Sequence, residues 1–141
     1  SSGSYQSLSP MPDYINSRGE KMILVNLEKQ AFSAYDERGN MLRWGPISGG
    51  KNYCRDLKRS CLTVEGSYRI YLKRGKECAS RKYKSPMPYC MFYKDGYAIH
   101  GADLPGHHAS HGCVRVFVDD ARWLSREFAK VGTRVKIIRG N

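Results

Sequence analysis

The sequence lacks any apolar run long enough to cross a membrane. A spanning helix needs about 18 or more consecutive apolar residues, and no stretch of these 141 residues approaches that length. The first twelve residues also lack the charged leader and apolar segment of a signal peptide. We therefore expect no membrane span, and we expect any leader used for export to have been removed already.

Acidic residues are scarce. The chain has 13 Asp and Glu against 24 Lys and Arg, a formal net charge of +11. This imbalance favours a partner rich in carboxylate or phosphate, such as nucleic acid or the bacterial cell wall. The basic residues are scattered in short loop clusters, at 73–76 and 81–84, and no nucleic-acid-binding motif is present. We therefore expect no nucleic-acid partner.

Cysteine pairs with the spacing of a zinc site are also missing. The five cysteines include no Cys-x2-Cys pair. Four of them flank two loop segments, which favours the short closures Cys54–Cys61 and Cys78–Cys90, although four cysteines allow three connectivities. Two disulfides would indicate an oxidising compartment, whereas four reduced thiols in a cytosolic protein remain the alternative. Either way, Cys113 is expected to be the unpaired thiol.

The pattern of apolar residues predicts one mostly β domain. Residues 1–20 are expected to form an extended arm, and residues 21–141 the folded domain, a β-rich sandwich or barrel-like structure. One main α-helix is expected near the C-terminus, from about 120 to 130, capped by Asp119 and ended by Gly132. The expected strands cover residues 22–27, 30–35, 41–47, 67–72, 97–100, 113–118 and 133–138.

All four histidines, and the unpaired cysteine, lie between residues 98 and 118. A thiol becomes a nucleophile when an imidazole takes its proton. His100 and Cys113 are 13 positions apart, at the ends of two expected strands bridged by one glycine-rich loop. If these strands are neighbours, the two side chains can meet. His111 is the rival base, but it lies only two residues before the thiol.

Backbone groups and other side chains complete this candidate site. The amide at Gly112, together with that of Cys113, is expected to stabilise an oxyanion, and the Gly101 carbonyl to orient His100. Arg115 is placed to pair with a substrate carboxylate. Ser110 contacts substrate or stabilises the turn, and Tyr89 contacts substrate or packs in the core.

These motifs resemble the catalytic domain of L,D-transpeptidases, the YkuD-type family. The resemblance rests on His100-Gly101, a Gly/Pro loop, and Ser110-His111-Gly112-Cys113-Val114-Arg115. It extends outward over residues 26–30, 47–51, 63–70, 87–92 and 119–124, and so covers about 21–138. The chain departs from the family pattern at Thr63-Val64 and in its two candidate disulfides.

The resemblance implies a cysteine acyltransferase of the bacterial cell envelope, periplasmic or secreted. Cys113 would cleave the diaminopimelate–D-alanine bond of a peptidoglycan tetrapeptide stem. His100 would act as base, and the acyl group would pass to an amine to form a 3→3 cross-link. It also implies inhibition by carbapenems and no cofactor.

Three other functions stay open on the sequence alone. Water as acceptor would make the protein an L,D-carboxypeptidase. A binding module for the cell wall or a host surface could keep the fold without catalysis. The histidines with Cys113 could also bind a metal, although our expectation is that no metal is bound.

Overall fold

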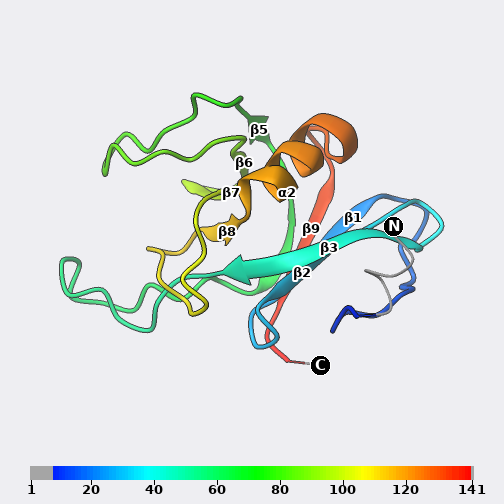
Figure 1. Ribbon diagram of the computed structural model, residues 1–141, viewed down its shortest axis with the longest axis horizontal. Helices are drawn as coiled ribbons and strands as arrows, with labels where there is room; N and C mark the ends of the chain where they lie inside the picture. The colour runs from blue at the N-terminus through cyan, green and yellow to red at the C-terminus, as the bar shows by residue number, and fades with distance from the viewer. Residues whose placement is uncertain (1–7, 141) are drawn as a thin grey trace.

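Nine strands of the described residues, 8–140, form a single sheet in this computed structural model (Figure 1). The sheet order is β4-β9-β1-β2-β3-β8-β7-β6-β5. It curls until its ends approach one another, and the rings of Tyr68 on β4 and Tyr93 on β6 lie 5.1 Å apart. The strands are β1 Met22–Asn26, β2 Ala31–Tyr35, β3 Met41–Ser48, β4 Gly66–Arg69, β5 Leu72–Lys73, β6 Met91–Lys94, β7 Tyr97–Gly101, β8 Val114–Val116 and β9 Arg134–Ile138.

The expected β-rich, barrel-like fold is therefore confirmed. The first three strands form antiparallel hairpins, as the turn residues between them predict. Two pairings in the sheet are parallel, β1 with β9 and β7 with β8. The second pairing matters for function because it places the strand that ends at Gly101 directly beside the strand that follows Cys113.

One helical segment near the C-terminus is present, as expected, but its start was predicted wrongly. Helix α2 covers Val118–Trp123, and a π-helical turn, η1, continues it over Leu124–Phe128. The N-cap is Phe117, with no side-chain capping bond, and Asp119 lies inside the first turn. Ala121, Leu124 and Phe128 form the buried face of this segment, whereas Val131, which continues the same helical spacing, is 64% exposed because the helix ends before it.

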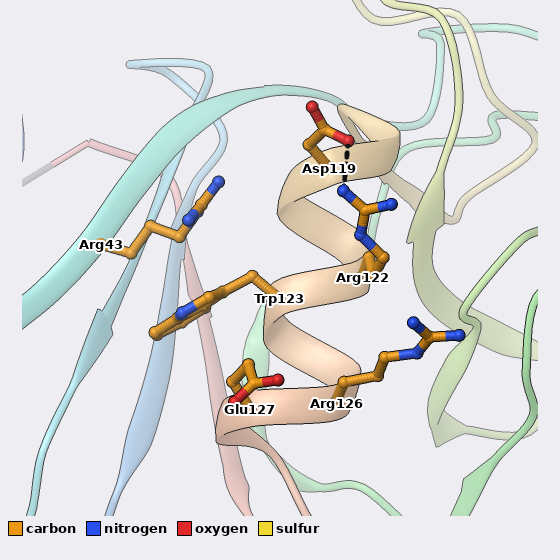
Figure 2. A pocket seen from close by; sticks show the side chains of 6 residues that line it. All are labelled: Arg43, Asp119, Arg122, Trp123, Arg126 and Glu127. Atoms are coloured by element: carbon orange, nitrogen blue, oxygen red, sulfur yellow. Dashed lines mark hydrogen bonds and ion pairs between the residues drawn. The ribbon is translucent and has the colours of Figure 1, made fainter.

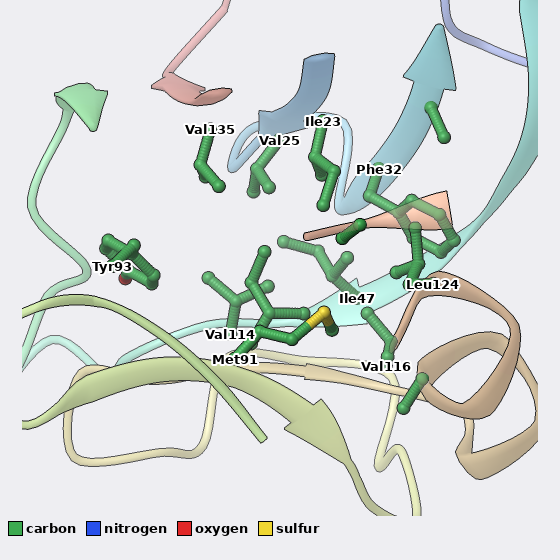
Figure 3. Packing of buried hydrophobic residues seen from close by; sticks show 14 of the residues in the cluster. Ile23, Val25, Phe32, Ile47, Met91, Tyr93, Val114, Val116, Leu124 and Val135 are labelled. Atoms are coloured by element: carbon green, nitrogen blue, oxygen red, sulfur yellow. The ribbon is translucent and has the colours of Figure 1, made fainter. Parts of the chain in front are cut away.

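The core lies between the curled sheet and this helix (Figure 3). Strand β8 alternates as a half-buried strand does: Val114 and Val116 are fully buried, and Arg115 between them is partly exposed. Ile99 on β7 and Leu124 on the helix pack in the same cluster. His100, which follows Ile99, and Arg115, which lies between Val114 and Val116, therefore point to the opposite face of the sheet.

The described part of the N-terminal arm is packed against the first hairpins. Met11 is 4% exposed and joins a second cluster with residues of β1 and β2. The Tyr35 hydroxyl donates to the Pro12 carbonyl oxygen at 2.7 Å. Residues 1–7 of the expected arm lie outside the described residues.

Both favoured disulfides are present. Cys54 is bonded to Cys61 and Cys78 to Cys90, so Cys113 is the one free thiol among the described residues. In Figure 1 the two disulfide-closed loops and the loop before β8 extend to the same side of the molecule. Within the described range, no helix is long and apolar enough to span a membrane.

Candidate active site

Parallel pairing puts the thiol and the expected base on one face of the sheet. In the register of β7 and β8, His100 lies opposite Arg115, and Ile99 lies opposite Val114. Continuing the register by one residue sets Cys113 opposite Ala98. Because side chains alternate along a strand, Cys113, His100 and Arg115 share the face opposite the core. The strands that the sequence analysis required to be neighbours are neighbours.

His100 is held in one tautomer. Its ring is buried, and Nδ1 lies 2.9 Å from the Gly101 carbonyl oxygen. A carbonyl oxygen can only accept, so Nδ1 carries the hydrogen and Nε2 keeps its lone pair. Burial lowers the pKa of His100, and the nearby Arg115 charge lowers it further, against the opposing effect of the Gly101 bond. The ring is thus a neutral imidazole with a free acceptor nitrogen.

Cys113 rests as a thiol. Its side chain is partly buried and packs against the apolar cluster of Met87, Ala98 and the Cys78–Cys90 disulfide. Burial raises the pKa of Cys113, although a backbone hydrogen bond from Ala98 and the charge of Arg115 act in the other direction. With a neutral thiol and a neutral imidazole on the same face of the sheet, attack by the thiol requires a proton transfer.

The loop before Cys113 is fixed by side-chain hydrogen bonds to its backbone. Ser110 Oγ donates to the Cys113 carbonyl oxygen at 2.6 Å and accepts from Gly112 N–H at 3.1 Å. Thr63 Oγ1 donates to the Gly112 carbonyl oxygen at 2.9 Å and accepts from Gly50 N–H at 2.8 Å. In a trans peptide the C=O and N–H point in opposite directions, so Thr63 also fixes where the Cys113 N–H points.

Two sequence-based assignments change as a result. Ser110 is 1% exposed and both its side-chain hydrogen bonds lie inside the loop, which supports the turn-stabilising alternative over a contact with substrate. The Gly112 N–H is engaged by Ser110, which leaves the backbone N–H groups of Cys113 and His111 for an oxyanion. Gly112 itself is needed because its φ is +129°.

Tyr89 also has a structural place. It is 5% exposed, belongs to the main core cluster, and carries the Arg126 guanidinium over its ring at 5.2 Å. These contacts support the core-packing alternative for Tyr89. Arg115 is partly exposed, and among the described residues no carboxylate forms an ion pair with it. It remains the candidate for a substrate carboxylate.

His111, the rival base, is turned toward the disulfide-closed loops. Its Nε2 lies 3.1 Å from Asp56 Oδ2, in the Cys54–Cys61 loop. Its ring stacks on Tyr83, in the Cys78–Cys90 loop, with the centroids 4.5 Å apart. The bond to His111 helps to lower the pKa of Asp56 against the effect of desolvation. These contacts give His111 a role in joining loops, so we do not assign it as the base.

Sequence reasoning missed two positioning residues. The first is Thr63, described above, and the second is His108. Nδ1 of His108 accepts a hydrogen bond from Gly49 N–H at 2.8 Å, and its Nε2 lies 2.8 Å from the Leu27 carbonyl oxygen. Both ring nitrogens are therefore occupied by backbone groups. The presence of Thr63 in the segment that resembles the family was the available signal, whereas nothing in the sequence distinguished His108 from an ordinary loop histidine.

The geometry does not favour a metal centre. Donor atoms of Cys54, Asp56 and His111 lie within 4.8 Å of one another. However, the Cys54 sulfur is bonded to Cys61 and cannot be a thiolate ligand. The nitrogens of His108 and Nδ1 of His100 are also taken by backbone groups.

A hollow of about 310 Å³ on the outer side of the helix is a surface feature (Figure 2). The Arg43 guanidinium lies 5.4 Å from the Trp123 ring and also pairs with Asp120 at 2.8 Å. Arg122 pairs with Asp119 at 3.0 Å. Because these two cations already have partners, we assign no chemistry to this hollow.

A Gly112→Ala substitution tests how closely the nucleophile loop is packed. A Cβ there would lie 2.5 Å from Cε1 of Tyr97 and would sit on a residue with φ of +129°. The strained backbone alone costs about 1–3 kcal/mol, and displacement of Tyr97 adds to it. We expect lower stability in urea denaturation and slower acylation of Cys113. Gly106→Ala is the matched control, because φ is +88° there but nothing lies within 4 Å. Equal losses in both variants would contradict a tight contact with Tyr97.

One family model matches most of the chain. The family model for the YkuD L,D-transpeptidase catalytic domain matches residues 20–137. No curated protein sequence matches the chain.

Solved structures of L,D-transpeptidases share the fold. The enzyme from Xylanimonas cellulosilytica (residues 123–326) has 27% identity and a TM-score of 0.76 over 90% of this chain and 64% of its own. L,D-transpeptidase 3 of Mycobacterium tuberculosis, solved with a faropenem-derived adduct, has 17% identity and a TM-score of 0.68 over 84% of this chain and 60% of its own. L,D-transpeptidase LdtMt1, solved with imipenem, has 20% identity and a TM-score of 0.67 over 84% of this chain and 58% of its own. The chain thus spans less than two thirds of each of these structures.

Proposed function

Because this chain belongs to the YkuD family of L,D-transpeptidase catalytic domains, we propose that it is a peptidoglycan L,D-transpeptidase with Cys113 as its nucleophile. The observation that carries the proposal is the shared sheet face of Cys113, His100 and Arg115, set by the parallel register of β7 and β8. This reaction needs a free thiol, a neutral imidazole with an open nitrogen, and a cation that no carboxylate of residues 8–140 neutralises in an ion pair.

In the first half-reaction the Cys113 sulfur attacks the carbonyl carbon of the third stem residue, diaminopimelate. The thiol proton passes to Nε2 of His100 as the carbon–sulfur bond forms. The backbone N–H of Cys113, whose direction Thr63 fixes, stabilises the oxyanion. The imidazolium then gives its proton to the nitrogen of the departing D-alanine, the carbon–nitrogen bond breaks, and a thioester remains.

In the second half-reaction an amine of another stem attacks the thioester. His100 takes a proton from that amine, the carbon–sulfur bond breaks, and the sulfur is reprotonated to the thiol. The product is a 3→3 cross-link, and atoms and charge balance without a cofactor. Arg115 binds a carboxylate of the stem, because its guanidinium offers paired donors on the face of the nucleophile.

The two disulfides and the positive charge fit a cell-envelope location, periplasmic or secreted. Disulfides persist in oxidising compartments, and a net charge of +11 favours association with an anionic wall. The imipenem and faropenem complexes of the relatives support the expectation that carbapenems acylate Cys113.

Incubation with purified tetrapeptide muropeptides, followed by mass spectrometry of the products, tests the function. We expect loss of D-alanine and formation of cross-linked dimers. Tripeptide alone would identify the L,D-carboxypeptidase alternative. No turnover, together with wall binding that survives Cys113→Ala, would overturn the enzyme proposal in favour of a binding module.

A further inference from the structure

A cleft of about 980 Å³ lies between strands β5 and β6 and the loop closed by Cys78–Cys90. Both aromatic and cationic side chains line it. The lining residues that matter here are Tyr71, Tyr83, Phe92, Arg74, Arg81 and Lys82. Neither Cys113 nor His100 lines it, so the cleft is a feature additional to the candidate active site.

The charge of the cleft is not neutralised from within. Glu77 is the acidic residue among those that line it. None of the carboxylates in the described part of the chain forms an ion pair with Arg74, Arg81 or Lys82. Three cations around one concave surface attract an anionic ligand more strongly than the same charges spread over a convex surface.

The cleft leads to the nucleophile along one row of the sheet. Leu72 on β5 lies opposite Phe92 on β6, and Phe92 lies opposite Ala98 on β7. Ala98 is in turn beside Cys113, and Phe92 and Cys113 pack against the same apolar cluster. A chain bound across the ends of these strands would therefore run from the cleft to the sulfur.

The walls of the cleft are held in place. The Tyr71 hydroxyl donates to the Asp95 carbonyl oxygen. Tyr83 stacks on His111, which Asp56 holds from the other disulfide-closed loop. The backbone N–H of Arg74 donates to the carbonyl oxygen of Cys90 at 3.1 Å. A site that is ordered before binding loses less entropy when a ligand enters.

We propose that this cleft binds the carboxylate-bearing peptide that accepts the acyl group. This inference rests on the proposed transpeptidase function and assigns its second substrate. The sheet order β3-β8-β7-β6-β5 puts Arg115, on β8, and the cleft on different sides of β7. A donor carboxylate held at Arg115 leaves the cleft free for a second peptide, whose aliphatic parts contact the rings and whose carboxylates meet the three cations.

The test compares two charge-matched triple variants. The first is Arg74→Gln/Arg81→Gln/Lys82→Gln in the cleft. The second, Arg55→Gln/Lys58→Gln/Arg59→Gln, removes three charges from the Cys54–Cys61 loop and serves as the control. For each protein the acylation rate is measured with a carbapenem and with a tetrapeptide donor. The ratio of cross-linked dimer to hydrolysed tripeptide is then followed as the acceptor concentration rises.

We expect the cleft variant to acylate within about twofold of the parent, and its cross-linking ratio to fall about tenfold, as the loss of several partly exposed charge contacts implies. The control variant should keep the parent ratio. Added salt should lower the ratio in the parent but hardly in the cleft variant, because screening removes a contact that the variant already lacks.

Other results would overturn the assignment in recognisable ways. Normal acylation with an unchanged ratio would remove the cleft from acceptor binding and leave the proposed function intact. Slower acylation by the tetrapeptide at an unchanged ratio would identify a donor site instead. A parent protein that yields only tripeptide uses no peptide acceptor, and one that is not acylated at all overturns the transpeptidase proposal itself.

Discussion

Replacing Cys113 with alanine is expected to abolish both turnover and the carbapenem adduct. The other four cysteines are joined in two disulfides, so no second described thiol can take over the attack. Removing the nucleophile of a covalent enzyme lowers kcat by about 10⁴-fold or more. Alanine suits the site better than serine, because the Cys113 side chain packs in an apolar cluster where a hydroxyl would lack partners. Intact-mass spectrometry after carbapenem treatment and the muropeptide assay measure the two losses.

Thermal denaturation of the same variant is the control for folding. A small change in Tm together with lost activity would show that the variant is folded and that the loss comes from removal of the nucleophile. An adduct of unchanged yield in Cys113→Ala would refute the role of this thiol, because it would have to come from another group.

Replacing His100 with glutamine is expected to lower kcat/KM by about 10²–10⁴-fold, the usual contribution of a general base. Glutamine retains a donor that can reach the Gly101 carbonyl oxygen but offers no group that takes a proton at neutral pH. The matched control is His107→Gln, a change of the same type at an exposed position of the neighbouring loop. We expect the control to stay within about threefold of the parent, since surface substitutions away from special features have small effects. Similar losses in both variants would argue against His100 as the base.

The lowered pKa of His100 also predicts the pH dependence. The base is active when neutral, so the acidic limb of kcat/KM should lie below pH 6.5, the ordinary value for histidine. The free energy of unfolding should also decrease toward acidic pH. The unfolded chain binds a proton at a higher pH than the folded chain does, so the free energy of unfolding should fall as the pH drops from about 6.5 through the lowered pKa. The His100→Gln variant should lose this part of the dependence, which titration with urea at several pH values can measure. An acidic limb above pH 6.5 would contradict a buried, neutral imidazole.

Much of the fold could be predicted because its signals are local. A short apolar run predicted β1, alternation of apolar residues predicted β2, and the turn-forming residues 36–40 lie between β2 and β3, which pair as a hairpin. The helix boundary was missed because Asp119 is a good capping residue by type, but the chain leaves β8 too close to the helix for it to occupy that position. Val131 continues the helical spacing of Ala121, Leu124 and Phe128 in the sequence, but the helical segment ends at Phe128.

In the candidate site, too, some features were predictable from local sequence and others depended on distant contacts. The motif around Cys113 and His100 and the pairing of the cysteines were readable from residue types and short spacings. The roles of Ser110, Tyr89 and His111 were not, because each depends on partners far along the chain. His111 meets Asp56, 55 residues away, and no local pattern encodes that contact.

By itself the sequence determined most of the strands, the unpaired thiol, the favoured disulfide-closed loops and the histidine proposed as the base. Only the tertiary structure decided which face of the sheet they share, which amide is already engaged, and which cations gather in the cleft beside β5. The physical reason is that strand periodicity and turn chemistry act within a few residues, whereas sheet register and loop contacts join residues that are distant in sequence.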